Sequence, residues 1–304
     1  MSPLRGIALK LTAVVLFTIM ASLIKASSEY VPTGEAVFFR SFFAMPVIVA
    51  WLAMRGDLRS GLKAKNPLLH IWRGLIGVMA MGCGFAALGL LPLPEVTALG
   101  FAAPMMTVLL AALMLGERLR AFRLSAVGLG LLGVLIVLWP RLSLDELGGS
   151  ATLGVALVLT SAVMRALAQI QIRKMVAVEE TSAIVFYFSL TATVFSLATI
   201  PFGWVWPAPE VVMMLVGAGL IGGIGQIFLT SAYRFAGAAV VAPFDYASIL
   251  LAILFGYWFF DEVPTAMVLI GSVVVVAAGG IIIWRERQLG LQRGKARPTM
   301  TPQG

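Results

Sequence analysis

The feature that most constrains this chain is a series of ten apolar runs, each close to twenty residues long. The hydrocarbon layer of a bilayer is about 30 Å thick and a helix rises about 1.5 Å per residue, so a spanning helix needs about twenty mostly apolar residues. Breaker residues separate the runs, and the absence of strict two-residue alternation favours helices over strands. The predicted spans are residues 6–25, 36–54, 73–91, 95–115, 122–140, 151–173, 183–203, 210–233, 238–259 and 264–284.

The composition agrees with a membrane protein. Apolar residues make up 60% of the 304 residues, charged residues 12%, and the mean hydropathy is +0.99. Soluble domains carry about 25% charged residues, so the composition excludes a soluble enzyme, a nucleic-acid-binding domain and a disordered chain. We therefore predict an all-α integral membrane protein with ten transmembrane helices.

The net charge of +8 indicates topology rather than a nucleic-acid partner. With a cytoplasmic N-terminus, 18 basic residues fall on the cytoplasmic side and three, Lys25, Arg40 and Arg141, on the outer side. Because basic residues concentrate in cytoplasmic loops, we expect both termini to lie in the cytoplasm. The expected partner of the apolar spans is the lipid bilayer. Residues 291–304 are predicted to be a disordered basic tail. The oligomeric state stays open.

The chain contains an internal duplication. At an offset of 148 residues, 6–12 lie on 154–160 and 37–41 on 185–189; at 145, Glu117 lies on Glu262 and Trp139 on Trp284. The halves are therefore 1–145 and 150–290. Each holds five spans, an odd number, so the second half is inverted. Inverted repeats are typical of secondary transporters, whose substrate site lies near mid-membrane between the halves; a duplicated scaffold or a lipid enzyme is the alternative.

The ends of spans four and nine carry a family signature. They read Ala111-Ala-Leu-Met-Leu-Gly-Glu117 and Gly256-Tyr-Trp-Phe-Phe-Asp-Glu262, and residues 86–94 and 231–235 form similar turns one span earlier. The pattern resembles the drug/metabolite transporter superfamily, in particular the ten-helix EamA-type carriers and, among them, the YddG-like amino-acid and metabolite exporters. One departure is that Gly116 before the first glutamate becomes Asp261 before the second. The resemblance implies a bacterial inner (plasma) membrane protein that transports a small organic solute.

One basic residue lies deep in a predicted span. Arg165 is near the middle of 151–173, and helical spacing places Ser161, Ala162 and Gln169 on the same small, polar face. A charge at this depth costs about 3 kcal/mol or more, so it usually faces protein or water. Two interpretations stay open: Arg165 holds an anionic group such as a substrate carboxylate, or it pairs with a carboxylate or helix carbonyls for structure.

Asp245 is the acidic counterpart, about two turns into span 238–259, with Ser248 one turn further on. Its carboxylate could bind a substrate ammonium or exchange a proton for coupling. The alternatives are that Asp245 neutralises Arg165 or Lys10, or that it is hydrated at the cytoplasmic mouth.

Other polar residues join the predicted cavity. Ser22 lies in the first span, and Gln226 and Thr230 follow a stripe of small residues in the eighth, where side chains can bind a ligand or a neighbouring helix. Pro104 and Pro243 remove backbone donors within spans four and nine, so we expect them to kink these helices and free carbonyls.

An adaptable apolar pocket beside these polar groups is predicted from Phe101, Met105 and Tyr246. Phe101 and Tyr246 correspond under the 145-residue offset. The alternative is that these residues pack in the core or face lipid. The complete candidate cavity is Ser22, Phe101, Met105, Arg165, Gln169, Gln226, Thr230, Asp245, Tyr246 and Ser248.

Catalytic and cofactor motifs are absent from the sequence. There is no Gly-rich phosphate loop, no Ser/His/Asp set, and one Cys and one His leave no Cys/His metal cluster. The leading interpretation is a secondary transporter, not an enzyme and without a cofactor, that exports neutral or aromatic amino acids and related metabolites by alternating access. The alternatives are a carrier of cationic drugs or nucleotide-linked metabolites, and a non-transporting membrane enzyme or scaffold. Proton coupling and facilitated diffusion both stay open.

Overall fold

The structure, a computed structural model, describes residues 3–115, 121–142, 149–175, 178–235 and 242–295. In the first half the elements are α1 (Pro3–Ser27), α2 (Thr33–Met54), α3 (Leu58–Gly61), α4 (Pro67–Leu88), α5 (Leu93–Gly100), α6 (Ala102–Leu115), α7 (Ala121–Leu138) and the 3₁₀ turn η1 (Trp139–Leu142). In the second half they are α8 (Ser150–Met175), α9 (Thr181–Leu197), η2 (Ile200–Phe202), α10 (Pro209–Phe235), η3 (Ala242–Tyr246), α12 (Ala247–Phe260) and α13 (Ala266–Lys295).

All ten predicted spans coincide with helical segments, so the all-α membrane fold is confirmed. Six segments are long and apolar enough to cross a bilayer, and four shorter apolar segments of 10–17 residues lie in α7, α9, η3–α12 and α13. Large apolar side chains on the outer faces of the bundle are exposed, among them Leu132, Leu250 and Val273. Such a surface suits lipid rather than water.

The spans that carry the two prolines are discontinuous rather than kinked. Predicted span 95–115 is α5 and α6 with a break at Phe101, and predicted span 238–259 contains η3 followed by α12. In a continuous helix, residue 104 would donate its N–H to the carbonyl of Gly100. Pro104 has no N–H to donate. Pro104 lies in the first turn of α6, just after the break, whereas Pro243 lies in η3, before α12. The helices α6 and α12 begin at Ala102 and Ala247, which correspond under the 145-residue offset.

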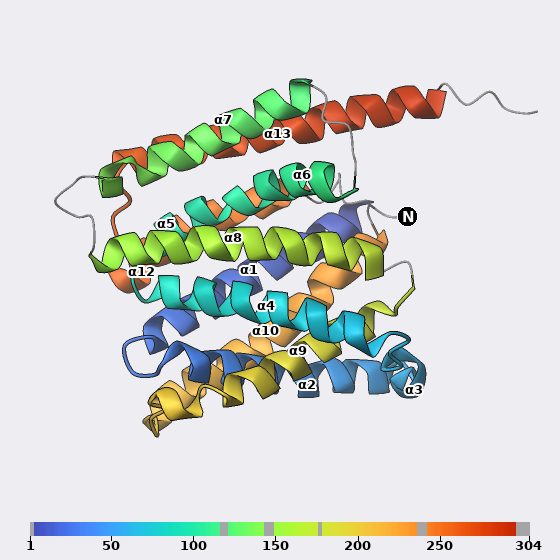
Figure 1. The fold of residues 1–304 in the computed structure, drawn as a ribbon, viewed down its shortest axis with the longest axis vertical. Coiled ribbons are helices and arrows are strands. Elements are labelled where there is room, and N and C mark those ends of the chain that lie inside the picture. Colours follow the sequence, from blue (N-terminus) through green and yellow to red (C-terminus); the bar gives the residue numbers. More distant parts are fainter. Residues whose placement is uncertain (1–2, 116–120, 143–148, 176–177, 236–241, 296–304) are drawn as a thin grey trace, which may run out of the picture.

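The contacts between the two halves follow an approximate two-fold symmetry, in which each contact has an equivalent made by the repeat counterparts. Helix α1 packs on α10, and its repeat counterpart α8 packs on α4, the counterpart of α10. Two further contacts join counterparts directly, α2 with α9 and α7 with α13. Figure 1 shows these two pairs at opposite edges of the bundle, with α4, α8, α1 and α10 between them. This arrangement places the interface of the halves in the middle of the molecule.

Small residues permit a close backbone contact between α7 and α13. A Cβ added at Gly133 would lie 2.9 Å from the carbonyl oxygen of Gly271, and one added at Gly271 would lie 2.6 Å from that of Gly133. Backbone-to-backbone contact of this kind is how membrane helices associate where lipid offers no hydrophobic driving force.

Helix α13 extends beyond its predicted end at residue 284 and continues to Lys295. The segment predicted to be disordered from residue 291 therefore begins as helix. Residues 296–304 lie outside the described part of the chain.

Candidate functional site: a basic cavity between the two halves

A cavity of about 580 Å³ lies between the halves, bounded by α1, α2, α4, α5, α6, α8, α9, α10 and the η3–α12 segment. Volumes of roughly 300–1,000 Å³ suit a whole small molecule. Its polar lining residues are Lys10, Thr18, Arg40, Arg73, Thr97, Ser161, Arg165, Gln169, Asp245 and Ser248.

The lining is strongly basic. Lys10, Arg40, Arg73 and Arg165 contribute four positive charges, against one carboxylate, Asp245, among the described lining residues. Buried charges of one sign are costly unless they are paired. The cavity therefore favours an anionic occupant.

Arg165 contacts the backbone that the α5–α6 break exposes. Its Nη2 donates a long hydrogen bond of 3.4 Å to the carbonyl of Gly100, the acceptor left without an intrahelical partner by Pro104. One turn away, Gln169 Oε1 accepts a hydrogen bond of 3.3 Å from Thr107. A neutral carbonyl leaves the charge of Arg165 uncompensated, so the guanidinium keeps its capacity to bind an anion.

Asp245 pairs with Lys10 across the η3–α1 contact. The carboxylate lies 2.7 Å from Lys10 Nζ, and the two side chains are 44% and 3% exposed, respectively. Among the alternatives for Asp245, pairing with Lys10 is the one present. The exposed carboxylate shows that this end of the cavity is accessible to water.

At the opposite end of the cavity, α1 forms a second ion pair, with Glu262, which follows the last residues of α12; we call this the closed end. Lys25 Nζ lies 2.8 Å from Glu262 Oε1 and donates to the carbonyls of Leu88 and Leu91 at 3.0 and 2.8 Å. Glu262 Oε2 accepts a hydrogen bond of 2.8 Å from the amide of Leu93. All three ammonium donors are used, and Leu88, Leu91 and Leu93 are buried around them.

A left-handed residue positions Glu262 for this pair. Asp261 ends α12 with φ of 53°, and the Glu262 amide turns back to the carbonyl of Gly256 at 3.0 Å. Asp tolerates this conformation better than most non-glycine residues, which explains the substitution of Asp261 for the glycine expected from the first repeat. Gly116 and Glu117 lie outside the described residues.

Comparison with known proteins identifies the family. The EamA-like transporter family matches the chain twice, at residues 4–139 and 152–284. The chain belongs to this family. It is 32–33% identical over 277 residues to proteins named pseudopaline exporter CntI from Pseudomonas aeruginosa, covering 90% of this chain and 94% of theirs. It is 25% identical to an S-adenosylmethionine uptake transporter of Rickettsia prowazekii, covering 89% of this chain and 90% of that protein.

The fold is also found among solved structures. One crystal structure matches with a TM-score of 0.67 and 23% identity, covering 93% of this chain and 98% of that one. The predicted resemblance to the drug/metabolite transporter superfamily is confirmed, and this EamA-like protein is a multi-pass transporter rather than an enzyme.

The cavity of this EamA-like transporter contains part of the predicted residue set. Arg165, Gln169, Phe101, Asp245 and Ser248 line it, as does the ring of Pro104. The rings of Phe101 and Tyr246 stack with centroids 4.9 Å apart, so Tyr246 supports the wall from behind.

Besides Tyr246, three predicted residues with described side chains are not among the lining residues of this cavity. Met105 is 1% exposed and packs in a cluster with Val127 and Ala278, because α6 turns this side chain toward α7 and α13. The Ser22 hydroxyl is satisfied by the carbonyl of Thr18 at 3.0 Å. Gln226 lies on α10, where Leu229 is the lining residue. The side chains of Thr230 and Pro243 lie outside the described part.

Three basic lining residues are absent from the predicted set. Arg40 and Lys10 lie inside predicted spans, but the charge count assigns them to the outer and cytoplasmic sides, whereas in the structure they are 6% and 2% exposed. Arg73 is the first residue of predicted span 73–91, whereas Asn66 and Pro67 begin α4 six residues earlier. An N-cap Asn followed by Pro was the available signal for Arg73.

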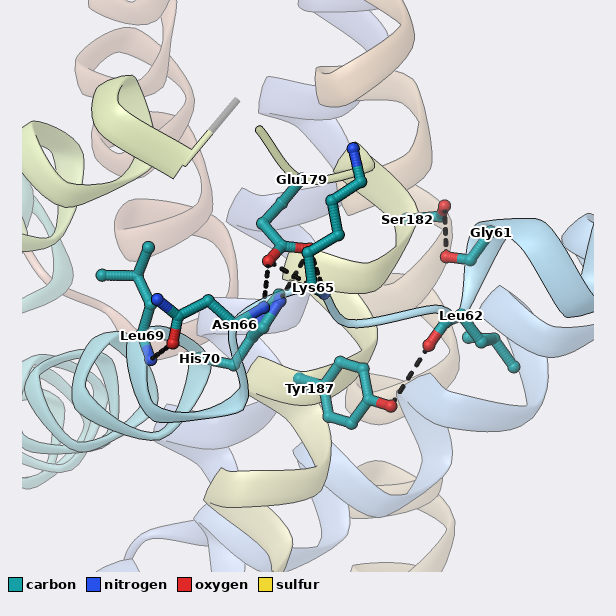
Figure 2. Close-up of polar contacts among 9 residues, drawn as sticks. All are labelled: Gly61, Leu62, Lys65, Asn66, Leu69, His70, Glu179, Ser182 and Tyr187. Atoms are coloured by element: carbon teal, nitrogen blue, oxygen red, sulfur yellow. Dashed lines mark hydrogen bonds and ion pairs between the residues drawn. The ribbon is translucent and has the colours of Figure 1, made fainter. Parts of the chain in front are cut away.

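A polar cluster outside the spans links the two halves. It lies on the side of the bundle where the cavity is accessible to water at Lys10–Asp245, which we call the wet end. Both carboxylate oxygens of Glu179 accept the Lys65 amide at 3.0 Å, and one accepts the Asn66 amide at 2.7 Å. His70 Nε2 lies 3.3 Å from Glu179. Figure 2 shows these contacts together with two side chains from α9, Ser182 and Tyr187, that donate to the carbonyls of Gly61 and Leu62.

The environment of Glu179 lowers its pKa. Burial of the carboxyl raises the pKa, but the amide hydrogen bonds from Lys65 and Asn66 and the contact with His70 outweigh it, so the pKa lies below 4.5. Glu179 is therefore ionised at neutral pH and holds the α3–α4 segment of the first half against the α8–α9 loop of the second.

Proposed function

We propose that this EamA-like protein is a secondary transporter of the bacterial cell membrane that exports a small carboxylate-bearing metabolite by alternating access. Amino acids and related metabolites, including the neutral and aromatic ones, are the simplest members of this class. The observation that carries the proposal is a cavity between the repeats that is wet at Lys10–Asp245 and closed at Lys25–Glu262.

Topology supports the direction of access. If basic loops are cytoplasmic, both termini are in the cytoplasm, and the wet end, near residue 10 of α1, faces the cytoplasm. The sealed end, at residue 25, then faces outward. A state that is open to the cytoplasm is the one that loads a solute for export. The export activity in the name of the Pseudomonas relatives supports the same direction.

The charge of the cavity favours this cargo over cationic drugs. Three arginines line it, and among the described lining residues the one acid, Asp245, is already paired with Lys10. A cation would meet net repulsion there. Facilitated diffusion and proton coupling through Asp245 both fit this arrangement, because the Asp245 carboxylate can reach water.

Counterflow in liposomes tests the proposal. Purified protein in vesicles preloaded with an unlabelled amino acid should accumulate the labelled one, and Arg165→Ala should slow this by about tenfold to a hundredfold, the loss of one charge-assisted contact. No counterflow of any amino acid by folded protein would contradict the proposal.

A matched pair of glutamines sharpens the test. Gln169→Ala removes a lining amide, whereas Gln226→Ala removes an amide that lies outside the lining. We expect slower counterflow in Gln169→Ala and a rate near that of the unmodified protein in Gln226→Ala. The reverse ranking would place the substrate elsewhere.

A further inference from the structure

Two arginines from different helices meet on one aromatic ring deep in the cavity. The guanidinium carbon of Arg40, on α2, lies 5.7 Å from the centroid of Phe188 on α9, and that of Arg73, on α4, lies 4.3 Å from the same centroid. Contact with a ring face stabilises a cation modestly and does not neutralise it. Two positive charges are therefore held next to each other.

These arginines lack protein partners for several donors. Arg40 Nε, and Nε and Nη1 of Arg73, are buried without a hydrogen-bond acceptor, and Arg40 as a whole is 6% exposed. No ion pair involves Arg40, Arg73 or Arg165 within the described ranges; the ion pairs there are Lys10–Asp245, Lys25–Glu262, Arg55–Asp57 and His70–Glu179. Buried donors without acceptors are costly and rare, so each one in a folded protein needs an explanation.

A purely structural role, such as an ion pair that joins two helices, does not explain why Arg40 and Arg73 are kept side by side. A charge retained within a membrane span normally pairs with another side chain or lines a pathway, and Arg40 and Arg73 line the cavity. Gly77 makes room for the contact between Arg73 and Phe188, because a Cβ there would collide with Arg73 Nη1 and would lie 2.6 Å from the Phe188 ring. Arg73 is thus accommodated on the ring that Arg40 also contacts, and neither guanidinium has an acidic partner within the described ranges.

Arg165 is the third arginine of the lining, and it contacts other elements than the Arg40–Arg73 pair does. It lies on α8 against Gly100 of α5, whereas the Arg40–Arg73 pair lies against α9. Both belong to the lining of one cavity of about 580 Å³. A single carboxylate at Arg165 would leave the charges of the Arg40–Arg73 pair uncompensated.

We propose that the cavity binds solutes with at least two anionic groups, carboxylate or phosphate, one held by Arg40 and Arg73 and another by Arg165. This inference rests on the proposed transport function, since it specifies the substrate class of the same cavity. It shifts the preferred cargo from neutral amino acids to acidic ones and to other polyanionic metabolites.

Ligand-induced thermal stabilisation of the purified full-length protein in detergent tests this directly and needs no transport. The probes are L-glutamate and L-glutamine, which differ by one anionic group, together with citrate and O-phospho-L-serine. We expect L-glutamate to bind at least tenfold more tightly than L-glutamine. The relative shifts with citrate and O-phospho-L-serine tell whether carboxylate or phosphate is preferred.

Variants locate the effect. Arg40→Gln and Arg73→Gln should each weaken binding of the dianions by about tenfold to a hundredfold while changing L-glutamine binding little. Arg55→Gln is the matched control, because Arg55 lies at the exposed end of α2 over Trp51 and outside the lining. Arg40→Lys keeps the charge without the fork of donors and should retain part of the affinity.

Stability without ligand provides a second readout. If Arg40 serves to bind an anionic ligand and not to stabilise the fold, Arg40→Gln should leave the melting temperature of the ligand-free protein unchanged or raise it, because an uncompensated buried charge is removed. Equal binding of L-glutamate and L-glutamine, no stabilisation by any of the anions at millimolar concentration, or equal binding by Arg40→Gln and Arg55→Gln would overturn the proposal. Dianion binding without flux in liposomes would instead contradict only the transport function.

Discussion

The two ends of the cavity are joined by the same kind of contact but differ in how firmly it is held. At each end a lysine of α1 pairs with an acid of the η3–α12 segment, Lys10 with Asp245 and Lys25 with Glu262, at 2.7 and 2.8 Å. At the closed end both side chains are less than one-fifth exposed, whereas the Asp245 carboxylate is 44% exposed.

The surrounding backbone accounts for this difference. Two carbonyls and one amide of the α4–α5 turn complete the Lys25–Glu262 pair, so three segments are locked together. An ion pair gains strength from supporting hydrogen bonds and from exclusion of water. The closed end is therefore the stronger constraint on the conformation, and the wet end is the one that a solute can enter with little rearrangement.

Breaking the closed end should produce the largest effect. Lys25→Met leaves the Glu262 carboxylate and two carbonyls without their shared donor, which costs about 3 kcal/mol for a mostly buried pair. We expect a lower melting temperature in detergent. In a Cys83→Ser background, Leu91→Cys should become reactive toward a membrane-impermeant maleimide in cells when Lys25→Met is added.

A charge exchange provides the control for this experiment. Lys25→Glu combined with Glu262→Lys restores opposite charges and should recover part of the stability and of the protection of Leu91→Cys. If labelling of Leu91→Cys is the same with and without Lys25→Met, the Lys25–Glu262 pair does not keep the closed end of the cavity inaccessible to the reagent.

Removing the Glu179 hydrogen bonds that join the two halves near the wet end should have an intermediate effect on stability. Glu179→Gln removes a charge-assisted acceptor of the Lys65 and Asn66 amides and should lower the free energy of unfolding by about 1–2 kcal/mol. Glu180→Gln, at the exposed neighbouring position, is the matched control.

The pH dependence of this effect has a defined sign. Because the pKa of Glu179 is lower in the folded protein than 4.5, its stabilisation is fully present above pH 4.5 and is lost as the pH falls through the folded pKa. The difference in melting temperature between the unmodified protein and Glu179→Gln should therefore be constant above pH 5 or so and shrink below pH 4.5. A constant difference over the whole range would show that the carboxylate charge is not responsible.

Asp245→Asn should have the smallest effect on stability. The exposed carboxylate contributes at most about 1 kcal/mol to the ion pair, so the melting temperature should change little. Counterflow should persist within a few-fold, and Asp57→Asn at an exposed loop position serves as the control. A loss of counterflow as large as in Arg165→Ala would mean that Asp245 belongs to the substrate-binding groups.

The sequence predicted the architecture well because bilayer thickness imposes it. Ten apolar runs and an odd number of spans per repeat are sufficient to predict the inverted halves. The helix break at Phe101 was only partly predictable: Pro104 indicated a disturbance, but whether a helix kinks or breaks depends on what the freed carbonyl meets, here Arg165 from the other half.

The binding surface was harder to predict because it depends on which side of a helix faces inward and where each span begins. Arg165 is identifiable as a charge in the middle of a span, whereas Arg40 and Arg73 lie within two turns of a predicted span end, and the charge count places them at the two membrane surfaces. Met105 and Arg165 were equally plausible cavity residues by position, yet α6 turns Met105 into a buried cluster. Whether a side chain points into the cavity or into the core is decided by contacts between segments that are far apart in the sequence.

The Arg40–Phe188 contact also has an implication for the ancestry of the site. Arg40 and Phe188 occupy the same position of the two repeats, at the 148-residue offset, and they meet where α2 contacts α9. In a homodimer of two identical half-length subunits, this place would hold two arginines or two phenylalanines. Because both copies are in one chain, the two positions can differ, one a cation and the other a ring, so an asymmetric solute can be held on an almost symmetric scaffold.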